Sequence, residues 1–502
     1  MNADNQEALP DGSLLAAIDL GSNSFHLIIA KIDHGEMRPV EALAEKVQLG
    51  AGLEHGRLSE AAIQRGLDCL ARFAQLLGSV DVQRVRVVGT HALRMAKNRR
   101  AFTGPAQRIL GTRVDVVYGL EEARLVYLGV AHSLADDAQS RLVIDIGGGS
   151  TECIIGQRFE PQFMESLPMG CVSFAATCFP KGKISKKNYR KAYDLACDQA
   201  VRIRHRFRSR HWEECVGSSG TLQAIETILS QNDWGDGGID RRGLATLEEK
   251  MLKFKLFEDI DVDGLAEQRR NVILPGVAIA CALFDVLGIK HMRTSRGALR
   301  EGVIYDLMGR LTHEDVRERT VNALMLRYGV DADTADIVER RARTFYTATH
   351  RTWQLTGDDW ELLHWLARTH EIGMAISHKH FNRHTAYLLR EADLPGFSQE
   401  EQELLALLAL GHRGKPGADL FKGVGEADQA RTLYLLTIFR LATCFKYVEN
   451  LEQLPDFSIL PSENALTLDF PAGWLADHPL TARELEAEQG ALRKAGLKLT
   501  IT

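Results

Sequence analysis

Several common signals are missing from this chain of 502 residues. No C-x-x-C pair occurs among its 8 cysteines, which argues against zinc knots and dithiol redox motifs. No uninterrupted run of about 18 apolar residues is present, so we expect no membrane-spanning helix and no stable membrane insertion. Residues 1–12 lack the basic start and apolar stretch of a secretion signal, and we expect a disordered tail there. Free cysteines without such a signal predict a cytoplasmic protein.

Two nucleotide-binding signatures are absent as well. No G-x-x-x-x-G-K-[ST] sequence occurs, which argues against a P-loop enzyme. The run Gly147–Gly149 lacks the spacing of a Rossmann fingerprint. The net charge of -6 and the pI of about 6.3 argue against a general nucleic-acid binder, so we expect no nucleic-acid partner.

One stretch departs from this acidic balance. Between residues 181 and 210 there are eleven Lys and Arg side chains and only two acids, Asp194 and Asp198. Such a stretch could guide a long polyanion, with Lys183, Lys187 and Arg190 as candidate contacts. A solvated helix face would have the same composition.

The strongest internal signal is a duplication. Residues 16–30 (AAIDLGSNSFHLIIA) align without a gap with residues 142–156 (LVIDIGGGSTECIIG), at an offset of 144 − 18 = 126. Each segment reads as an apolar strand, a small polar turn and a second apolar strand, which predicts a β-hairpin. Two matched hairpins predict two similar lobes that face each other, and ligand sites favour such clefts.

The rest of the chain predicts four domains. Short strands at Val85–Val88 and Val114–Val117 and a helix over Ser59–Leu77 favour an α/β architecture that continues to about residue 310. Helical patterns then dominate, and short strands return after residue 450. We expect lobe I at 13–130, lobe II at 131–312, an all-helical domain at 313–449 and a small C-terminal α/β domain at 450–502.

The two hairpin turns are candidate phosphate cradles. Successive backbone N–H groups in a tight turn form a nest for anions, and neighbouring hydroxyl and amide groups add donors. Two ordinary hairpin turns would be the plainer interpretation, but a matched pair that each time begins with Asp favours phosphate. The predicted phosphate ligands from these turns are Gly21, Ser22, Asn23, Ser24, Gly147, Gly148, Gly149, Ser150 and Thr151.

Carboxylates and an arginine accompany the turns. Asp145 and Asp19 follow apolar strands and are candidate ligands for Mg²⁺, with Asp145 favoured, because this ion takes oxygen ligands and needs only one or two carboxylates. Hydrolysis also needs a base for water, and three candidates are Glu121, Glu122 and Glu152. Arg94 follows a strand and could clamp phosphate, although a surface arginine is an equal alternative.

Other motifs leave their roles open. Gly217–Thr221 and Ser295–Gly302 are two further small-residue turns that enter helices, and each could meet a ligand or allow close packing. Histidines gather in the helical region, and we expect caps and surface positions for them instead of a metal site. The six considered as metal ligands are His364, His370, His378, His380, His384 and His412.

Together, these motifs resemble the bacterial exopolyphosphatase / guanosine pentaphosphate phosphohydrolase family, and most closely the exopolyphosphatases. The resemblance covers nearly the whole chain. The motifs that carry it are Asp19–His26, Gly89–Arg94, Glu121–Arg124, Asp145–Glu152, Gly217–Thr221 and Gly297–Gly302.

The resemblance implies two actin-like lobes of the sugar-kinase, heat-shock-protein and actin (ribonuclease H-like) class. It implies Mg²⁺, stimulation by K⁺ and a homodimer. Matched residue by residue, the catalytic glutamate is Glu122, the metal-binding aspartate is Asp145, and the second essential carboxylate is Glu152. Arg94 matches a phosphate-contacting arginine.

The helical domain resembles the His-Asp (HD) phosphohydrolase fold. The key pair here reads His370-Glu371 instead of His-Asp, which argues against a second metal centre. In the last motif, Arg296 replaces an acidic residue of the family.

The resemblance therefore predicts Mg²⁺-dependent, processive release of orthophosphate from inorganic polyphosphate. The first alternative is removal of the 5′ γ-phosphate from guanosine-5'-triphosphate,3'-diphosphate (pppGpp) at the same site. The second is a polyphosphate:ADP phosphotransferase, because fold alone does not separate kinases from hydrolases. A third class, a protein that binds polyphosphate without catalysis, is the least favoured, because three candidate carboxylates lie beside the turns.

Overall fold

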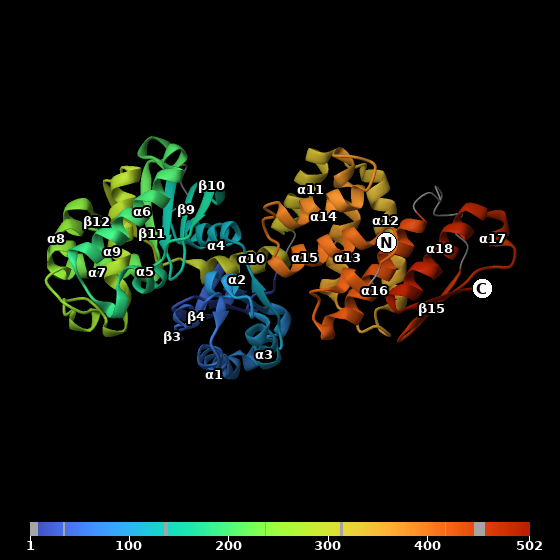
Figure 1. The fold of residues 1–502 in the computed structure, drawn as a ribbon, viewed down its shortest axis with the longest axis horizontal. Coiled ribbons are helices and arrows are strands. Elements are labelled where there is room, and N and C mark those ends of the chain that lie inside the picture. The colour runs from blue at the N-terminus through green and yellow to red at the C-terminus, as the bar shows by residue number, and fades with distance from the viewer. Residues whose placement is uncertain are drawn as a thin grey trace. The chain divides into compact units, whose positions relative to one another are not determined.

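The computed structural model describes residues 9–33, 36–134, 139–235, 237–311, 315–416, 418–445 and 457–502. The chain divides into two compact units, Met1–Val316 and Arg317–Thr502, which are coloured from blue to yellow and from yellow to red in Figure 1. Residues 1–8 of the predicted tail and the predicted boundaries at 312–313 and 449–450 lie outside the described residues. The four predicted domain limits therefore stay predictions.

The first lobe of unit 1 is built on a five-stranded sheet in the order β3-β2-β1-β6-β7. Its strands are β1 (Leu14–Leu20), β2 (Ser24–Asp33), β3 (Glu36–Lys46), β6 (Val85–Gly89) and β7 (Val114–Val116), with a small pair β4 (Leu53–Glu54) and β5 (Arg57–Leu58). Its helices are α1 (Glu60–Leu76), α2 (His91–Met95), α3 (Arg100–Leu110) and α4 (Gly119–His132). The Ser59 side chain accepts a hydrogen bond from the Ala62 backbone N–H, which caps α1 as predicted.

The second lobe repeats this plan with a six-stranded sheet in the order β10-β9-β8-β11-β13-β12. Its strands are β8 (Ser140–Ile146), β9 (Thr151–Gln157), β10 (Glu160–Leu167), β11 (Glu214–Ser218), β12 (Ile239–Asp240) and β13 (His291–Thr294). Its helices are α5 (Cys171–Cys178), α6 (Lys186–Phe207), α7 (Ser219–Gln231), α8 (Arg241–Met251), α9 (Arg270–Leu287) and α10 (Leu299–Leu311). In both sheets an antiparallel hairpin lies beside strands that run parallel to its first member.

The two predicted hairpins are therefore confirmed. β1 pairs antiparallel with β2, and β8 pairs antiparallel with β9. One buried apolar cluster contains residues of both sheets together with residues of α4 and α10, for example Ala17, Val143, Leu125 and Val303. Burial of this shared apolar surface favours association of the lobes.

One helix bears on the expectation that no helix spans a membrane. The helical segment Glu267–Leu287, which includes α9, is long and apolar enough to cross a membrane by length and composition. In the structure, 78% of its most apolar window is buried inside the protein. Since a helix that is apolar on all sides also occurs in protein cores, this burial identifies α9 as a core helix of the second lobe.

Unit 2 contains six long helices followed by a three-stranded sheet among its described residues. The helices are α11 (Val316–Tyr328), α12 (Ala332–Thr349), α13 (Gly357–Thr369), α14 (Phe381–Glu391), α15 (Gln399–Gly411) and α16 (Glu426–Cys444). The strands β14 (Ser458–Ser462), β15 (Ala465–Asp469) and β16 (Lys498–Ile501) accompany α17 (Trp474–Asp477) and α18 (Pro479–Ala495). Leu466 of β15 and Leu485 of α18 belong to the same apolar cluster as Phe345 and Leu436 of the helices.

Candidate active site

The two predicted cradles lie against each other inside unit 1. The first turn, Gly21–Asn23, joins β1 to β2, and the second turn, residues 147–150, joins β8 to β9. A Cβ atom added to Gly148 would lie 2.9 Å from the Ser22 Cβ and 3.4 Å from the Asn23 backbone nitrogen. Because these contacts are already close without a side chain, glycine allows the turns of the two lobes to meet.

A second close approach ties the turn of the second lobe to α2 of the first. A Cβ atom on Gly149 would overlap the His91 ring, at 2.1 Å from Nδ1. Burial, with help from nearby Arg94, lowers the pKa of His91 to about 4, so this ring is neutral near pH 7. Gly149 therefore serves packing between the lobes, and its backbone lies beside the other turn.

The first hairpin presents an aspartate and a histidine. Asp19 is the cross-strand neighbour of His26, and the His26 Nδ1 lies 3.2 Å from the Asp19 Oδ2. Three buried polar atoms at this turn have no hydrogen-bond partner among the described residues: Asp19 Oδ1, Ser22 Oγ and Asn23 Oδ1. Buried polar atoms are rarely left unsatisfied, so these atoms point to a ligand that completes the site.

The second hairpin presents two carboxylates. Asp145 is the cross-strand neighbour of Glu152, and the Ser166 hydroxyl of β10 donates to the Glu152 Oε1 at 2.8 Å. Burial raises the pKa of Asp145 to about 7, against a hydrogen bond from Ser218 of β11, and the carboxylates of Glu122 and Asp19 raise it further. Burial and the neighbouring Glu122 and Asp145 also raise the pKa of Glu152 well above its ordinary value.

Glu122 joins these acids from the first turn of α4. The Arg94 Nη1 donates to the Glu122 Oε2 and to the Val117 carbonyl oxygen, each at 2.9 Å. Burial raises the pKa of Glu122, while Arg94 opposes the shift and the charge of Asp19 adds to it. A carboxylate with a raised pKa beside other acids is a candidate general base.

The structure separates the two glutamates that the sequence left open. Glu121 is held by Arg124 Nε and Nη2, each 2.8 Å from one of its carboxylate oxygens. Glu122 instead accepts from Arg94, and its carboxylate, after burial, contributes to the raised pKa of Asp145 and of Glu152, which places it near the acids of the second hairpin. The geometry therefore favours Glu122 as the base.

The predicted phosphate ligands differ in what their side chains do. The Asn23 Nδ2 donates to the Ser24 Oγ at 3.3 Å, inside the first turn. The Thr151 hydroxyl donates to the Met169 carbonyl oxygen at 2.6 Å and is fully buried. The Thr151 hydroxyl proton is therefore already used within the fold, and phosphate binding by Thr151 stays a prediction.

The two small-residue turns whose roles the sequence left undecided lie in different surroundings. In the first, Ser218 ends β11 next to Asp145 in the sheet register, which brings the motif Gly217–Thr221 to the acids. In the second, Cβ atoms on Gly297 and Gly302 would lie 2.1 Å and 1.8 Å from backbone oxygens of α4. The second motif therefore serves close helix packing, and Arg296 in it is exposed.

The predicted polyanion contacts are exposed. Lys183 precedes α6, and Lys187 and Arg190 lie on it. The Arg190 Nε lies 2.8 Å from Asp194 Oδ1 four residues later on the same helix. This arrangement is that of a solvated basic face, and an attraction for a polyanion remains compatible with it.

The histidines of unit 2 form no metal site in the described part of the chain. As expected for caps, His370 and His412 are the C-cap residues of α13 and α15, and their Nδ1 atoms lie 2.8 Å and 2.6 Å from backbone carbonyl oxygens of the last turn; both are buried and not on the surface. Burial, followed by the influence of His370, lowers the pKa of His412. Both rings therefore belong to the core.

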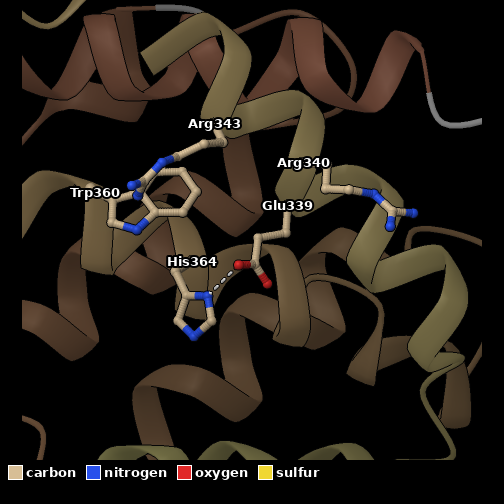
Figure 2. Close-up of a pocket in the computed structure, with 5 residues that line it drawn as sticks. All are labelled: Glu339, Arg340, Arg343, Trp360 and His364. Carbon is tan, nitrogen blue, oxygen red and sulfur yellow. Dashed lines mark ion pairs between the residues drawn. The ribbon is translucent and has the colours of Figure 1, made fainter. Parts of the chain in front are cut away.

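Unit 2 also has a cavity of about 330 Å³ between α12 and α13. Figure 2 shows the Arg343 side chain over Trp360, at 4.3 Å from the ring centroid, and the ion pair between His364 Nδ1 and Glu339 Oε1, at 2.9 Å. Apart from His364, none of the residues singled out from the sequence lines it.

The donor set of the two hairpins fits Mg²⁺. Asp145, Glu152 and Asp19 supply oxygen atoms, and Asp19 Oδ1 is one of the buried atoms without a partner in the described residues. Among these residues no three His, Cys, Asp or Glu side chains converge tightly enough to hold a metal alone. Mg²⁺ does not need such a cage, since it keeps several waters and takes one or two carboxylates.

Three residues of the site escaped the sequence argument. His26 could have been found, because the offset of 126 residues places it opposite Glu152 (26 + 126 = 152). His91 lay inside a motif but was assigned no role. Ser166 lies on β10 without any motif around it, and only the sheet register brings it to Glu152.

Unit 1 thus combines two mixed sheets of matching strand order with hairpin turns that lie against each other, and unit 2 follows it with a largely helical part. Comparison with known families agrees over most of the chain. The description "Ppx/GppA phosphatase family" matches residues 28–311, and "Ppx/GppA phosphatase, domain III" matches residues 316–489. The chain belongs to the Ppx/GppA phosphatase family, as the motifs predicted.

Relatives with curated names share most of their length with this chain. A protein of Pseudoalteromonas translucida named guanosine-5'-triphosphate,3'-diphosphate pyrophosphatase is 37% identical over 98% of this chain and 99% of its own. A protein of Photobacterium profundum with the same name is 38% identical over 96% of each chain. The solved structure of an exopolyphosphatase from Cytophaga hutchinsonii has a TM-score of 0.54 at 22% identity, over 59% of this chain and 98% of that one, which shows a shared fold.

Proposed function

We propose that this protein is a phosphohydrolase that removes the terminal 5′ phosphate of guanosine-5'-triphosphate,3'-diphosphate. The observation that carries the proposal is the convergence of Glu122, Asp145 and Glu152 beside two opposed small-residue turns. The names of relatives at 37% and 38% identity favour this substrate over polyphosphate, which reverses the order expected from sequence.

The proposed chemistry uses the groups of this chain in fixed places. The turns Gly21–Ser24 and 147–150 bind the terminal phosphate through backbone N–H groups. Glu122 accepts a proton from a water molecule as the water oxygen attacks the terminal phosphorus. The anhydride P–O bond then breaks, which releases orthophosphate and leaves guanosine 5′-diphosphate,3′-diphosphate as the second product. Arg94 orients Glu122 through the 2.9 Å hydrogen bond.

Asp145, with Asp19 and Glu152 nearby, would hold Mg²⁺ in this site. When bound, the ion neutralises charge on the phosphate oxygens. The acids suit this role because a cation offsets the mutual repulsion that raises the pKa of Asp145 and Glu152, after burial itself. We extend the proposal to K⁺ as an activator, a homodimer, a cytoplasmic location and an HD-like fold for the helical part of unit 2.

A second candidate substrate is inorganic polyphosphate. The exposed cations of the 181–210 stretch favour it, since they could guide a long polyanion toward a site in the same unit. Processive release of orthophosphate would use the same carboxylates and turns. A kinase that uses ADP as the acceptor is the least supported of the three.

The deciding experiment measures orthophosphate release by the purified protein with Mg²⁺ from pppGpp and, separately, from long-chain polyphosphate. Higher kcat/KM for pppGpp supports the proposal, and higher kcat/KM for polyphosphate supports the second candidate. Formation of ATP from polyphosphate and ADP, without orthophosphate release, would establish the kinase.

A variant tests the assigned base. Glu122→Ala is expected to lower kcat by 10²- to 10⁴-fold, roughly the range for loss of a general base, while binding of pppGpp persists. Near-full turnover of this variant would show that Glu122 is not the base, and Glu152 would be tested next.

A further inference from the structure

Asp306 is a buried carboxylate of α10 that has no part in the proposed chemistry. Its side chain is 3% exposed and pairs with three arginines from three elements: Arg86 of β6, Arg124 of α4 and Arg310 of α10 itself. The Arg310 Nε donates to the Asp306 Oδ2 at 3.0 Å. A buried carboxylate is tolerated only when it is paired in this way.

Two more acids belong to this group, which we call the Asp306 cluster. Arg124 also donates to Glu121, and the Arg86 Nε donates to the Asp115 Oδ2 of β7 at 3.3 Å. Among the residues that the structure describes, the members of the cluster are Asp306, Glu121, Asp115, Arg86, Arg124 and Arg310. Burial alone would raise the pKa of Asp306, but Arg124 and Arg86 hold it well below its ordinary value.

The cluster acts on α4 one residue before the proposed base. Successive residues of an α-helix point about 100° apart, because a turn contains 3.6 residues. Arg124 and Glu121 therefore fix one side of the first turn of α4, and Glu122 leaves the helix on the adjacent side, toward Arg94. A small rotation of α4 would carry Glu122 away from Asp145 and Glu152.

Glycines allow α4 and α10 to approach each other closely. A Cβ atom on Gly129 of α4 would lie 2.0 Å from the Ala298 backbone oxygen, and one on Gly302 of α10 would lie 1.8 Å from the Leu125 backbone oxygen. The separation of α4 and α10 is thus set by backbone contact. Backbone contact does not prevent α4 from rotating about its own axis. The Asp306 cluster supplies this restraint.

We propose that Asp306 is a positioning residue for hydrolysis, which holds α4 through Arg124 and Glu121 so that Glu122 faces the carboxylates of the second hairpin. The inference rests on the proposed function, since it assigns Glu122 as the base. It extends that function to a residue outside the site and gives the Glu121-Glu122 pair two different tasks.

The main test is Asp306→Asn, which keeps the shape of the side chain and removes one charge. Misplacement of a catalytic group by about 1 Å can lower the rate on the order of 10²-fold, so we expect kcat for pppGpp to fall by about that factor. The KM is expected to stay within about twofold, because the phosphate turns are unchanged.

Glu214→Gln is the matched control. Glu214 of β11 is also held by two arginines, Arg141 at 2.9 Å and Arg293, but it lies at the strand end opposite Ser218 and the acids. Its loss is expected to lower the thermal midpoint of unfolding with kcat unchanged. A purely structural Asp306 would behave in the same way, and kcat for Asp306→Asn within about twofold of the wild type would overturn the inference.

A milder variant decides the question if Asp306→Asn does not fold. Arg310→Gln removes the cation at the end of α10, and we expect kcat to fall about tenfold with KM retained. Unchanged kcat in folded Arg310→Gln and Glu121→Gln would also overturn the inference. Absence of orthophosphate release by the wild-type protein would instead refute the proposed function, so the two failures are distinguishable.

Discussion

The two hairpins of unit 1 share the same strand-turn-strand pairing, and one of the positions at which their side chains differ lies opposite the aspartates. Asp19 and Asp145 are equivalent by the offset of 126 residues, and both lie one residue before the end of their strands. The cross-strand neighbour of Asp19 is His26, whereas the neighbour of Asp145 is Glu152. His26 and Glu152 are themselves equivalent by the same offset.

The difference between His26 and Glu152 changes the chemistry beside the two aspartates. Directly opposed side chains in an antiparallel pair lie close together, so an imidazole opposite Asp19 can donate to it. A carboxylate opposite Asp145 can only repel it, and this repulsion adds to the burial that raises the pKa of Glu152. The second hairpin therefore favours a proton or a cation far more strongly than the first does.

The largest effect is expected from removing the charge of each aspartate in turn. Asp145→Asn should lower kcat/KM for pppGpp on the order of 10³-fold, because the proposed Mg²⁺ ligand is lost, and Asp19→Asn by about tenfold. Initial rates over a range of Mg²⁺ concentrations measure both. Equal losses would show that the two hairpins share the ion evenly.

Replacing the matched residues His26 and Glu152 tests directly whether they set the different roles of the two hairpins. Glu152→His should lower kcat on the order of 10²-fold, since the second hairpin would then resemble the first. His26→Gln, which retains a polar side chain beside Asp19, should cost less than about tenfold. A larger loss for His26→Gln than for Glu152→His would assign the main chemical role to the first hairpin.

The dependence of kcat/KM on pH tests the role of Glu122 as the base. A base acts only when ionised, and burial raises the pKa of Glu122 above its ordinary value. The kcat/KM should thus fall about tenfold per pH unit on the acidic side of a pKa that lies above the ordinary range of a glutamate. A profile of pH against kcat/KM measures this limb, and its persistence in Glu122→Ala would assign it to another group.

The smallest effect concerns the basic face of the second lobe, which includes Lys183, Lys187 and Arg190. Charge reversal at Lys183, Lys187 and Arg190 should raise the KM for long-chain polyphosphate several-fold and that for pppGpp about twofold or less. Lys253→Glu is the control, because this lysine is also exposed but lies outside the basic stretch. Equal changes in KM for both substrates would contradict a role in guiding polymers.

Local patterns predicted the elements of unit 1 well. The helix after Ser59 and the strands near Val85 and Val114 occur as expected, because apolar periodicity and capping act within a few residues. Thr151 shows the limit of a motif. It belongs to the glycine-rich turn in sequence, but its hydroxyl bonds to Met169, a partner 18 residues away that no local pattern indicates.

The histidines of unit 2 show the same limit in another form. Polar residues are usually exposed, so composition favoured caps and surface positions for the histidines, and His370 and His412 are indeed C-caps. Helix packing placed both in the core, where backbone carbonyl oxygens satisfy one nitrogen of each ring. Burial of this kind depends on which helix faces meet, which a single sequence does not state.

The sequence by itself determined the duplicated hairpins, the small-residue turns and the family, because each of these depends on residues that are neighbours along the chain. Only the tertiary structure decided which of Glu121 and Glu122 lies among the acids, since adjacent helical residues point about 100° apart. It also decided that Gly302 serves packing and that Asp306 is paired with three arginines. These outcomes depend on contacts between segments that are up to 220 residues apart, where burial and charge pairing select one arrangement.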